Sequence, residues 1–142
     1  MYRTALAAIA LFVTTTALAQ PTMVVRDTSG HQVDVAAEGT VVLFWSMTDA
    51  AAAQDLVQLS ERAAMGQQVV AINTDGAIDK ARVRPFVRRL GISNVTVAHD
   101  TTGELANTLH AEAGEALWMG NAQVASRGEV RTLPTVTAVA TR

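Results

Sequence analysis

Apolar residues recur along the chain in short runs that alternate with amphipathic stretches. The runs 41–45, 68–73 and 95–98 are rich in β-branched or aromatic residues and have the length of buried strands. Residues 50–64 and 79–90 place apolar side chains at helical spacing, which predicts one helix after each of the first two strands. Strands that alternate with helices form a parallel sheet through right-handed crossovers. The pattern therefore predicts an α/β fold.

Further short strands are predicted near the two ends of the chain. Residues 23–26 and 32–35 flank an Asp-Thr-Ser-Gly turn and are predicted to form a hairpin. Residues 123–125 and 130–133 flank a Ser-Arg-Gly-Glu turn and are predicted to form a second hairpin. The stretch 110–120 has no clear period, and we expect a loop or a weak helix there.

The first buried strand runs into the first predicted helix through a short turn that contains Asp49. In α/β proteins such strand-to-helix turns are the usual place for functional residues. One interpretation makes Asp49 the helix N-cap, a contribution of about 1 kcal/mol. The other makes it an acid, base or ligand contact, although a helix N-terminus lowers the pKa of a carboxylate and disfavours general-acid work. We favour the cap.

The composition of the chain excludes or disfavours several classes of function. The 142 residues include no cysteine, so thiol–disulfide exchange and thiol peroxidase chemistry, which need a thiolate, are excluded. A formal net charge of −2 gives no electrostatic reason to bind nucleic acid. The three histidines lack ligand spacing, and no Gly-rich phosphate-binding motif is present. We therefore predict no cofactor and no metal site.

The first nineteen residues have the organisation of a cleavable signal peptide. Arg3 precedes an apolar run, and Ala17-Leu18-Ala19 is an A-x-A cleavage site. The apolar run is shorter than the ~20 residues that a membrane-spanning helix needs, so we expect no membrane span after cleavage. The predicted organisation is a signal peptide, 1–19, and one domain, 20–142, in a periplasmic or secreted protein.

The central stretch resembles the exported TlpA/ResA branch of the thioredoxin-like superfamily. Phe44-Trp45 match the strand end that precedes the Trp-Cys-x-x-Cys turn of that branch, and Thr48 stands where the second Trp would be. Residues 49–52, Asp-Ala-Ala-Ala, fall on the Cys-x-x-Cys positions. The similarity continues through 69–75 and 100–105. The resemblance implies a redoxin that lacks its cysteine pair.

The resemblance also implies an architecture: a thioredoxin-like three-layer fold with an N-terminal β-hairpin, a central mixed sheet and flanking helices. We expect residues 136–140 to extend the last hairpin and the terminal helix of the fold to be missing. In this family a cis-proline loop faces the cysteines. Met119 occupies that position in one alignment frame and Pro134 in the other, and short connections favour Met119.

The implied function is that of a non-catalytic binding or accessory protein with a polypeptide partner in the former active-site groove. Two alternatives remain: an enzyme that uses Asp49 for non-thiol chemistry, and a degenerate relic of a disulfide reductase. The basic helix at 79–90 is either a solvated face or a patch for an acidic partner. The predicted groove residues are Trp45, Met47, Asp49, Trp118 and Met119.

Overall fold

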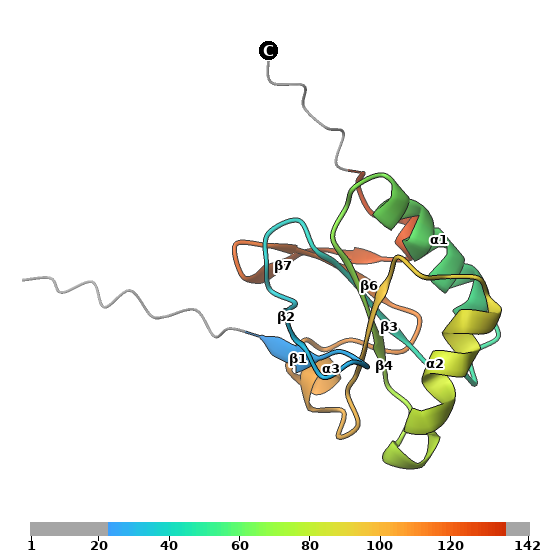
Figure 1. The fold of residues 1–142 in the computed structure, drawn as a ribbon. Coiled ribbons are helices and arrows are strands. Elements are labelled where there is room, and N and C mark those ends of the chain that lie inside the picture. Colours follow the sequence, from blue (N-terminus) through green and yellow to red (C-terminus); the bar gives the residue numbers. More distant parts are fainter. Residues whose placement is uncertain (1–22, 136–142) are drawn as a thin grey trace, which may run out of the picture.

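The computed structural model describes residues 23–135, which form a central five-stranded sheet (Figure 1). The strand order is β5-β4-β3-β6-β7. Strands β3, β4 and β5 are parallel, whereas β6 pairs antiparallel with both β3 and β7, so the predicted mixed sheet is confirmed. The predicted signal peptide and the extension at 136–140 lie outside the described residues. The strands are β3 (Val41–Trp45), β4 (Val69–Asn73), β5 (Thr96–His99), β6 (Ala116–Gly120) and β7 (Gln123–Gly128).

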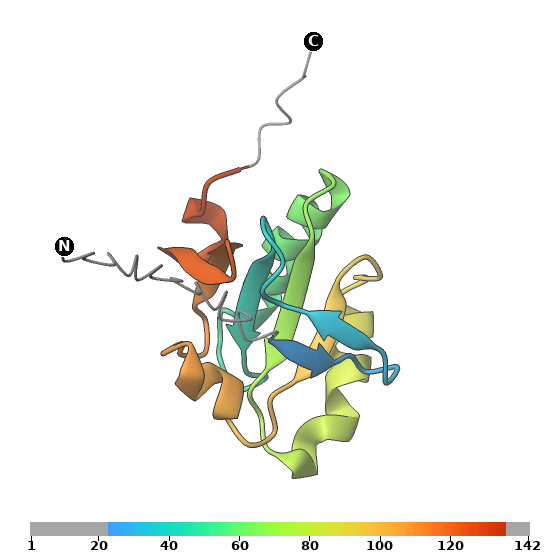
Figure 2. The same cartoon turned by 90° about the vertical axis from the view of Figure 1, so that its left-hand side faces the viewer.

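Each face of the sheet is covered by a different layer. Helices α1 (Ala52–Ala64) and α2 (Lys80–Arg89) cover one face, and a short 3₁₀ turn, η1 (Ala77–Asp79), leads into α2. The hairpin of β1 (Val24–Arg26) and β2 (Gln32–Asp34) covers the other face together with α3 (Glu104–Thr108). Figure 2 shows this hairpin and α3 in front of the sheet. The three layers match the predicted architecture.

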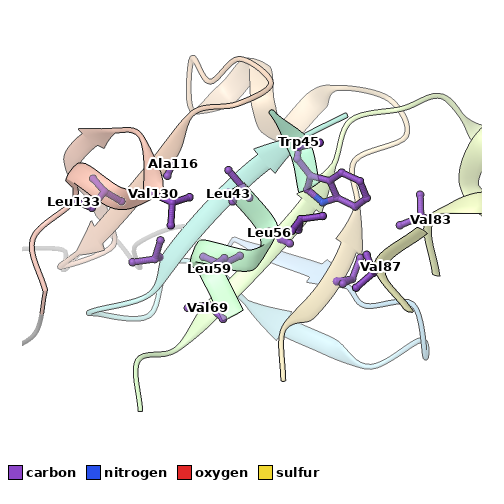
Figure 3. Close-up of a cluster of buried hydrophobic side chains, with 14 residues drawn as sticks. Leu43, Trp45, Leu56, Leu59, Val69, Val83, Val87, Ala116, Val130 and Leu133 are labelled. Carbon is purple, nitrogen blue, oxygen red and sulfur yellow. The ribbon is translucent and has the colours of Figure 1, made fainter. Parts of the chain in front are cut away.

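Strands β3 and β4 are buried along their whole length, which explains why they are continuous apolar runs. Alternate residues of β3 enter two separate cores. Val42 and Phe44 pack in the core beneath the hairpin and α3. The core on the opposite face joins strand and helix side chains, and Figure 3 shows Leu43, Trp45, Leu56, Leu59, Val69, Val83 and Val87 within it.

The prediction for the C-terminal part was wrong. Residues 116–120 form the strand β6 rather than a loop, and β7 includes the first three residues, 126–128, of the predicted Ser-Arg-Gly-Glu turn. The true turn is at Asn121 and Ala122, with φ values of 51° and 59°. Two-residue hairpin turns of this kind favour glycine. Neither turn residue is a glycine here, so the sequence pattern did not indicate the turn. After β7 the chain forms the 3₁₀ turn η2 (Val130–Thr132), whose Val130 is fully buried.

Within residues 23–135, no helix combines the length and the apolarity that crossing a membrane requires.

Candidate functional site

The turn between β3 and α1 is tied to the neighbouring strand by Asp75, which lies just beyond the end of β4. The carboxylate of Asp75 accepts hydrogen bonds from Ser46 Oγ (2.5 Å), the Met47 N–H (2.8 Å) and Asn73 Nδ2 (2.9 Å). Ser46 Oγ also lies 2.8 Å from Thr48 Oγ1. Asp75 therefore fixes the start of the 46–49 turn. Sequence analysis missed this role, although strand order alone brings the ends of β3 and β4 together.

The pKa of Asp75 reflects two opposing effects. Burial raises it, but the hydrogen bonds from Met47, Ser46 and Asn73 stabilise the charged form and together lower the pKa below its ordinary value. The carboxylate is thus ionised at neutral pH and committed to three donors. This arrangement suits a structural clamp.

Asp49 lies two residues before the N-cap of α1, so it is not the cap that the sequence predicted. The N-cap residue is Ala51, and the helix begins at Ala52. Asp49 Oδ1 accepts the Ala51 N–H at 2.9 Å, and the Asp49 carbonyl accepts the Ala52 N–H at 3.1 Å. The carboxylate still satisfies a backbone donor at the start of the helix, but through an Asx-type turn.

Asp49 lies beside Gly114 in the wall of a polar hollow of about 320 Å³, which we call the Asp49 cleft. A Cβ atom added to Gly114 would lie 3.1 Å from Asp49 Oδ2, and the φ of Gly114 is +91°. The Gly114 N–H donates to the Phe44 carbonyl at 2.7 Å, which holds the loop before β6 against β3. The cleft is lined by Asp49, Ala51, Gln54, Asp55, Gln58, Ala113, Gly114, Glu129 and Arg131.

The charges in the Asp49 cleft are partly balanced within it. Burial raises the pKa of Asp55, repulsion from Asp49 and Glu129 raises it further, and Arg131 opposes the shift. Arg131 Nε also donates to Glu129 Oε2 at 2.7 Å. Among the described residues, no group of three or more His, Asp or Glu side chains is placed to hold a metal ion.

A second hollow, of about 430 Å³, lies on the α2 side of the same turn, and we call it the Met47 groove. Phe86 forms part of its wall and stacks on the buried Trp45, with ring centroids 5.5 Å apart and planes inclined by 28°. Apolar groups thus form its centre and arginines its edges. It is lined by Met47, Ala81, Arg82, Pro85, Phe86 and Arg89.

The structure does not bring the five predicted groove residues together. Met47 lines the Met47 groove and Asp49 lines the Asp49 cleft, while Trp45 is fully buried behind Phe86. Trp118 pairs with Val41, so four residues of β3, about 13 Å, separate its register position from Trp45. Met119 is buried in the core on the opposite face of the sheet. The cause is that β6 is an antiparallel strand rather than a loop.

Neither frame for the cis-proline loop fits the structure. Met119 lies inside β6 and its N–H donates to the Thr40 carbonyl at 2.9 Å. Pro134 follows η2, and its carbonyl accepts a hydrogen bond from Arg62, near the C-terminal end of α1. The segment that faces the 49–52 turn is instead the loop at Gly114. Residues 23–135 contain no cis peptide bond.

No protein-family model matches the sequence, and no curated protein matches it either. Solved structures do match. The chain is similar to StoA from Bacillus subtilis, with a TM-score of 0.61, 13% identity, and coverage of 75% of this chain and 85% of StoA. It is also similar to a putative thiol:disulfide interchange protein DsbE from Chlorobium tepidum, with a TM-score of 0.65, 18% identity, and coverage of 78% and 82%.

A third similar structure is a secreted disulfide oxidoreductase from Mycobacterium tuberculosis that is homologous to DsbE. Its TM-score is 0.63 and its identity 21%, with coverage of 80% of this chain and 85% of that one. At such low identities, these TM-scores show a shared fold and nothing more. The layers, the strand order and the neighbours agree with the resemblance of the sequence: the chain has the thioredoxin-like fold of DsbE- and StoA-type thiol-disulfide oxidoreductases and carries no cysteine.

Proposed function

We propose that the protein is a redox-inactive, non-catalytic binding or accessory protein that docks a polypeptide in the Met47 groove. The observation that carries this proposal is an apolar hollow beside the turn where thioredoxin-like oxidoreductases hold their cysteines. The chain has no thiol with which to perform the interchange reaction for which its structural neighbours are named. Because one fold can carry many functions, the groove and not the fold supports this proposal.

The side chains of the groove suit a polypeptide ligand. Met47 is partly exposed and unbranched, so it can adapt to different side chains. Phe86 and Pro85 offer rigid apolar surface, and the stacking of Phe86 on Trp45 anchors that surface to the core. The arginines at the edges supply donors for backbone carbonyls or carboxylates.

Selection from a display library of random peptides tests this proposal directly. We expect the protein to enrich specific sequences, and Met47→Gln to abolish the enrichment because it replaces the apolar contact without adding charge. The matched control is Met65→Gln, since Met65 is 67% exposed and lines a different hollow. No enrichment, or equal enrichment by both variants, contradicts binding in the Met47 groove.

A second candidate is an enzyme that uses Asp49 for non-thiol chemistry. The supporting observation is the Asp49 cleft, where the Asp55 carboxyl has a raised pKa beside Asp49. This candidate predicts that Asp49→Asn abolishes turnover of some substrate and leaves peptide enrichment intact. The binding proposal predicts that Asp49→Asn changes stability alone.

The third alternative, a relic with no retained molecular role, predicts poor folding. Cooperative thermal unfolding of the purified protein, followed by circular dichroism, contradicts the relic. A broad transition without cooperativity supports it.

We also propose that the protein is exported to the periplasm or secreted, with its signal peptide removed after Ala19. The apolar run at the N-terminus supports this location, and one structural neighbour is itself a secreted protein. Intact mass spectrometry of the exported protein is expected to show Gln20 as the first residue. Retention of Met1 contradicts cleavage.

A further inference from the structure

We infer that the Met47 groove selects polypeptide segments in which an apolar side chain lies between two carboxylates. This inference rests on the proposed function and names the chemistry of its partner. The groove side of α2 presents Arg82, Pro85, Phe86 and Arg89, at positions i, i+3, i+4 and i+7 of the helix. That spacing forms one continuous stripe on a helix surface. Its centre is apolar and both its ends are cationic.

The two arginines set the spacing of the partner's charges. Seven residues of helix separate Arg82 from Arg89, a rise of about 10 Å. A polypeptide in the polyproline II conformation has three residues per turn and rises about 9 Å in that turn. Carboxylates at positions i and i+3 of such a segment therefore lie on the same side and reach both guanidinium groups, and the residues between them lie over Phe86 and Met47.

Both guanidinium groups are available to a partner. Arg82 contacts Asp79 at 3.7 Å, but the two side chains are 79% and 44% exposed, so this pair is weak and readily exchanged. Arg89 is exposed and makes no ion pair within residues 23–135. Cations with weak or absent partners at the edges of an apolar surface favour an acidic ligand.

The backbone of α2 offers a further contact in the same groove. Pro85 has no N–H, so the carbonyl of Ala81 lacks the donor that the helix would normally supply four residues later. Ala81 lines the groove beside Pro85. A docked extended segment has backbone N–H groups that can donate to this carbonyl. The groove thus matches an acidic polypeptide better than a bare anion, which would leave Met47 and Phe86 uncovered.

Chemical-shift titration of the isotope-labelled protein with three blocked hexapeptides tests the inference. The probes are Gly-Glu-Ala-Phe-Glu-Gly, its neutral Gln analogue and its basic Lys analogue. We expect the acidic peptide to bind about tenfold tighter than the neutral one, since each exposed charge pair contributes roughly a factor of three. We expect the basic peptide to bind more weakly than the neutral one. The preference for the acidic peptide should fall as salt is added.

Matched double variants on the same helix locate the effect. Arg82→Gln with Arg89→Gln should erase the preference for the acidic peptide. Arg84→Gln with Arg88→Gln removes the same charge from residues that line a different hollow, and should keep most of the preference. A short single-stranded RNA serves as a polyanion control and should not shift the signals of Met47 and Phe86.

The outcomes separate the inference from the proposed function. If the neutral and acidic peptides shift the signals of Met47 and Phe86 equally, the groove binds polypeptides and the inference is wrong. The inference also fails if the RNA competes with the acidic peptide, or if both double variants lose the preference equally. If no peptide shifts those signals and the display library gives no enrichment, the proposed function itself is wrong.

Discussion

The Met47 groove and the Asp49 cleft lie on opposite sides of one short turn, yet their chemistry differs. The groove faces α2 and the β4 side of β3, with an apolar centre and cationic edges. The cleft faces the β6 side, where Asp49 serves the Ala51 N–H and Arg131 pairs with Glu129. In the cleft Asp49, Glu129 and Arg131 have partners in the chain, whereas the groove leaves apolar surface uncovered. The difference favours the groove as the place of the proposed recognition and the cleft as a structural element.

The largest expected effect comes from removing the clamp that both regions share. Asp75→Ala leaves the Met47 N–H without its acceptor, and it removes the shorter of the two hydrogen bonds of Asn73 Nδ2 and one partner of Ser46 Oγ. We expect the free energy of unfolding to fall by about 2–3 kcal/mol, because unsatisfied buried donors cost more than the bond contributes. Peptide binding in the Met47 groove should weaken as well. Urea denaturation measures the first effect and peptide titration the second.

The pH dependence of this clamp gives an independent readout. The folded-state pKa of Asp75 is lowered, so its contribution to stability is fully present above the ordinary pKa of 3.8. That contribution is lost as the pH falls from 3.8 through the lower folded-state pKa. Asp75→Ala should therefore differ most from the natural protein at neutral pH and converge with it in strong acid. A constant difference across this pH range would show that Asp75 is not a charged clamp.

The next effect isolates the Asp49 cleft. Gly114→Ala places a residue with a Cβ atom at a φ of +91°, and that Cβ lies 3.1 Å from Asp49 Oδ2. Gly66→Ala is a matched control, since its φ is +89° and nothing lies within 4 Å of its added Cβ. We expect the free energy of unfolding to fall by about 2 kcal/mol for Gly114→Ala and by about 1 kcal/mol for Gly66→Ala, as measured by urea denaturation.

A double-variant cycle then tests whether Asp49 causes the larger loss of stability at Gly114. When Asp49→Ala is also present, Gly114→Ala should lower the free energy of unfolding by about as little as Gly66→Ala, because Asp49 Oδ2 no longer crowds the added Cβ. An unchanged cost in the double variant would mean that the loop at Gly114 does not face Asp49. Peptide binding in the Met47 groove should be unaffected throughout.

The register of the resemblance can be tested by restoring cysteines. Asp49→Cys with Ala52→Cys places one thiol in the turn before α1 and the other at the first residue of α1, three positions apart. We expect a disulfide that dithiothreitol reduces, detected by thiol alkylation and mass spectrometry, with at most a small change in stability because the closed loop is short. Thiols that stay reduced in a folded, air-oxidised variant would show that 49–52 is misaligned with Cys-x-x-Cys.

The central sheet was predictable because its strands are strongly patterned. Val41–Trp45 is a continuous apolar run and Val69–Asn73 is apolar up to its last residue, and the helices α1 and α2, one after each strand, have regular amphipathic spacing. Strand β6 was missed although it is as long as β3 and β4, because its turn at Asn121 and Ala122 carries no glycine. Because β6 was taken for a loop, Trp118 and Met119 were expected beside Trp45, whereas the structure places Trp118 opposite Val41 and Met119 in the core on the other face of the sheet.

The candidate site was only partly predictable for a related reason. Met47 and Asp49 were selected because they lie in the turn after β3, which local pattern alone can place. Asp75 and Phe86 reach the same turn from other elements, and their roles depend on tertiary contacts. Phe86 looked like an ordinary core residue by helical spacing. Its stacking on Trp45 at the wall of an open groove is visible only in three dimensions.

The smallest expected effect concerns the charge balance of the Asp49 cleft. The pKa of Asp55 is raised by burial and then by repulsion from Asp49 and Glu129, so ionised Asp55 destabilises the fold. Stability therefore falls as the pH rises from the ordinary pKa of 3.8 through the higher folded-state pKa. Asp55→Asn should stabilise the protein at neutral pH by less than about 1 kcal/mol, since solvent screens this partly exposed group. The gain should vanish below pH 3.8.

Thermal unfolding at neutral and acidic pH measures this gain, with Glu61→Gln as the control. Glu61 is an exposed acid on the same helix and is not part of the cleft, so its substitution changes the net charge equally. If both variants raise the melting temperature alike, the gain comes from net charge and not from the cleft. If Asp55→Asn destabilises the protein at neutral pH, the Asp55 carboxylate has a favourable partner. The description of the charges in the Asp49 cleft, and with it the comparison with the Met47 groove, is then wrong.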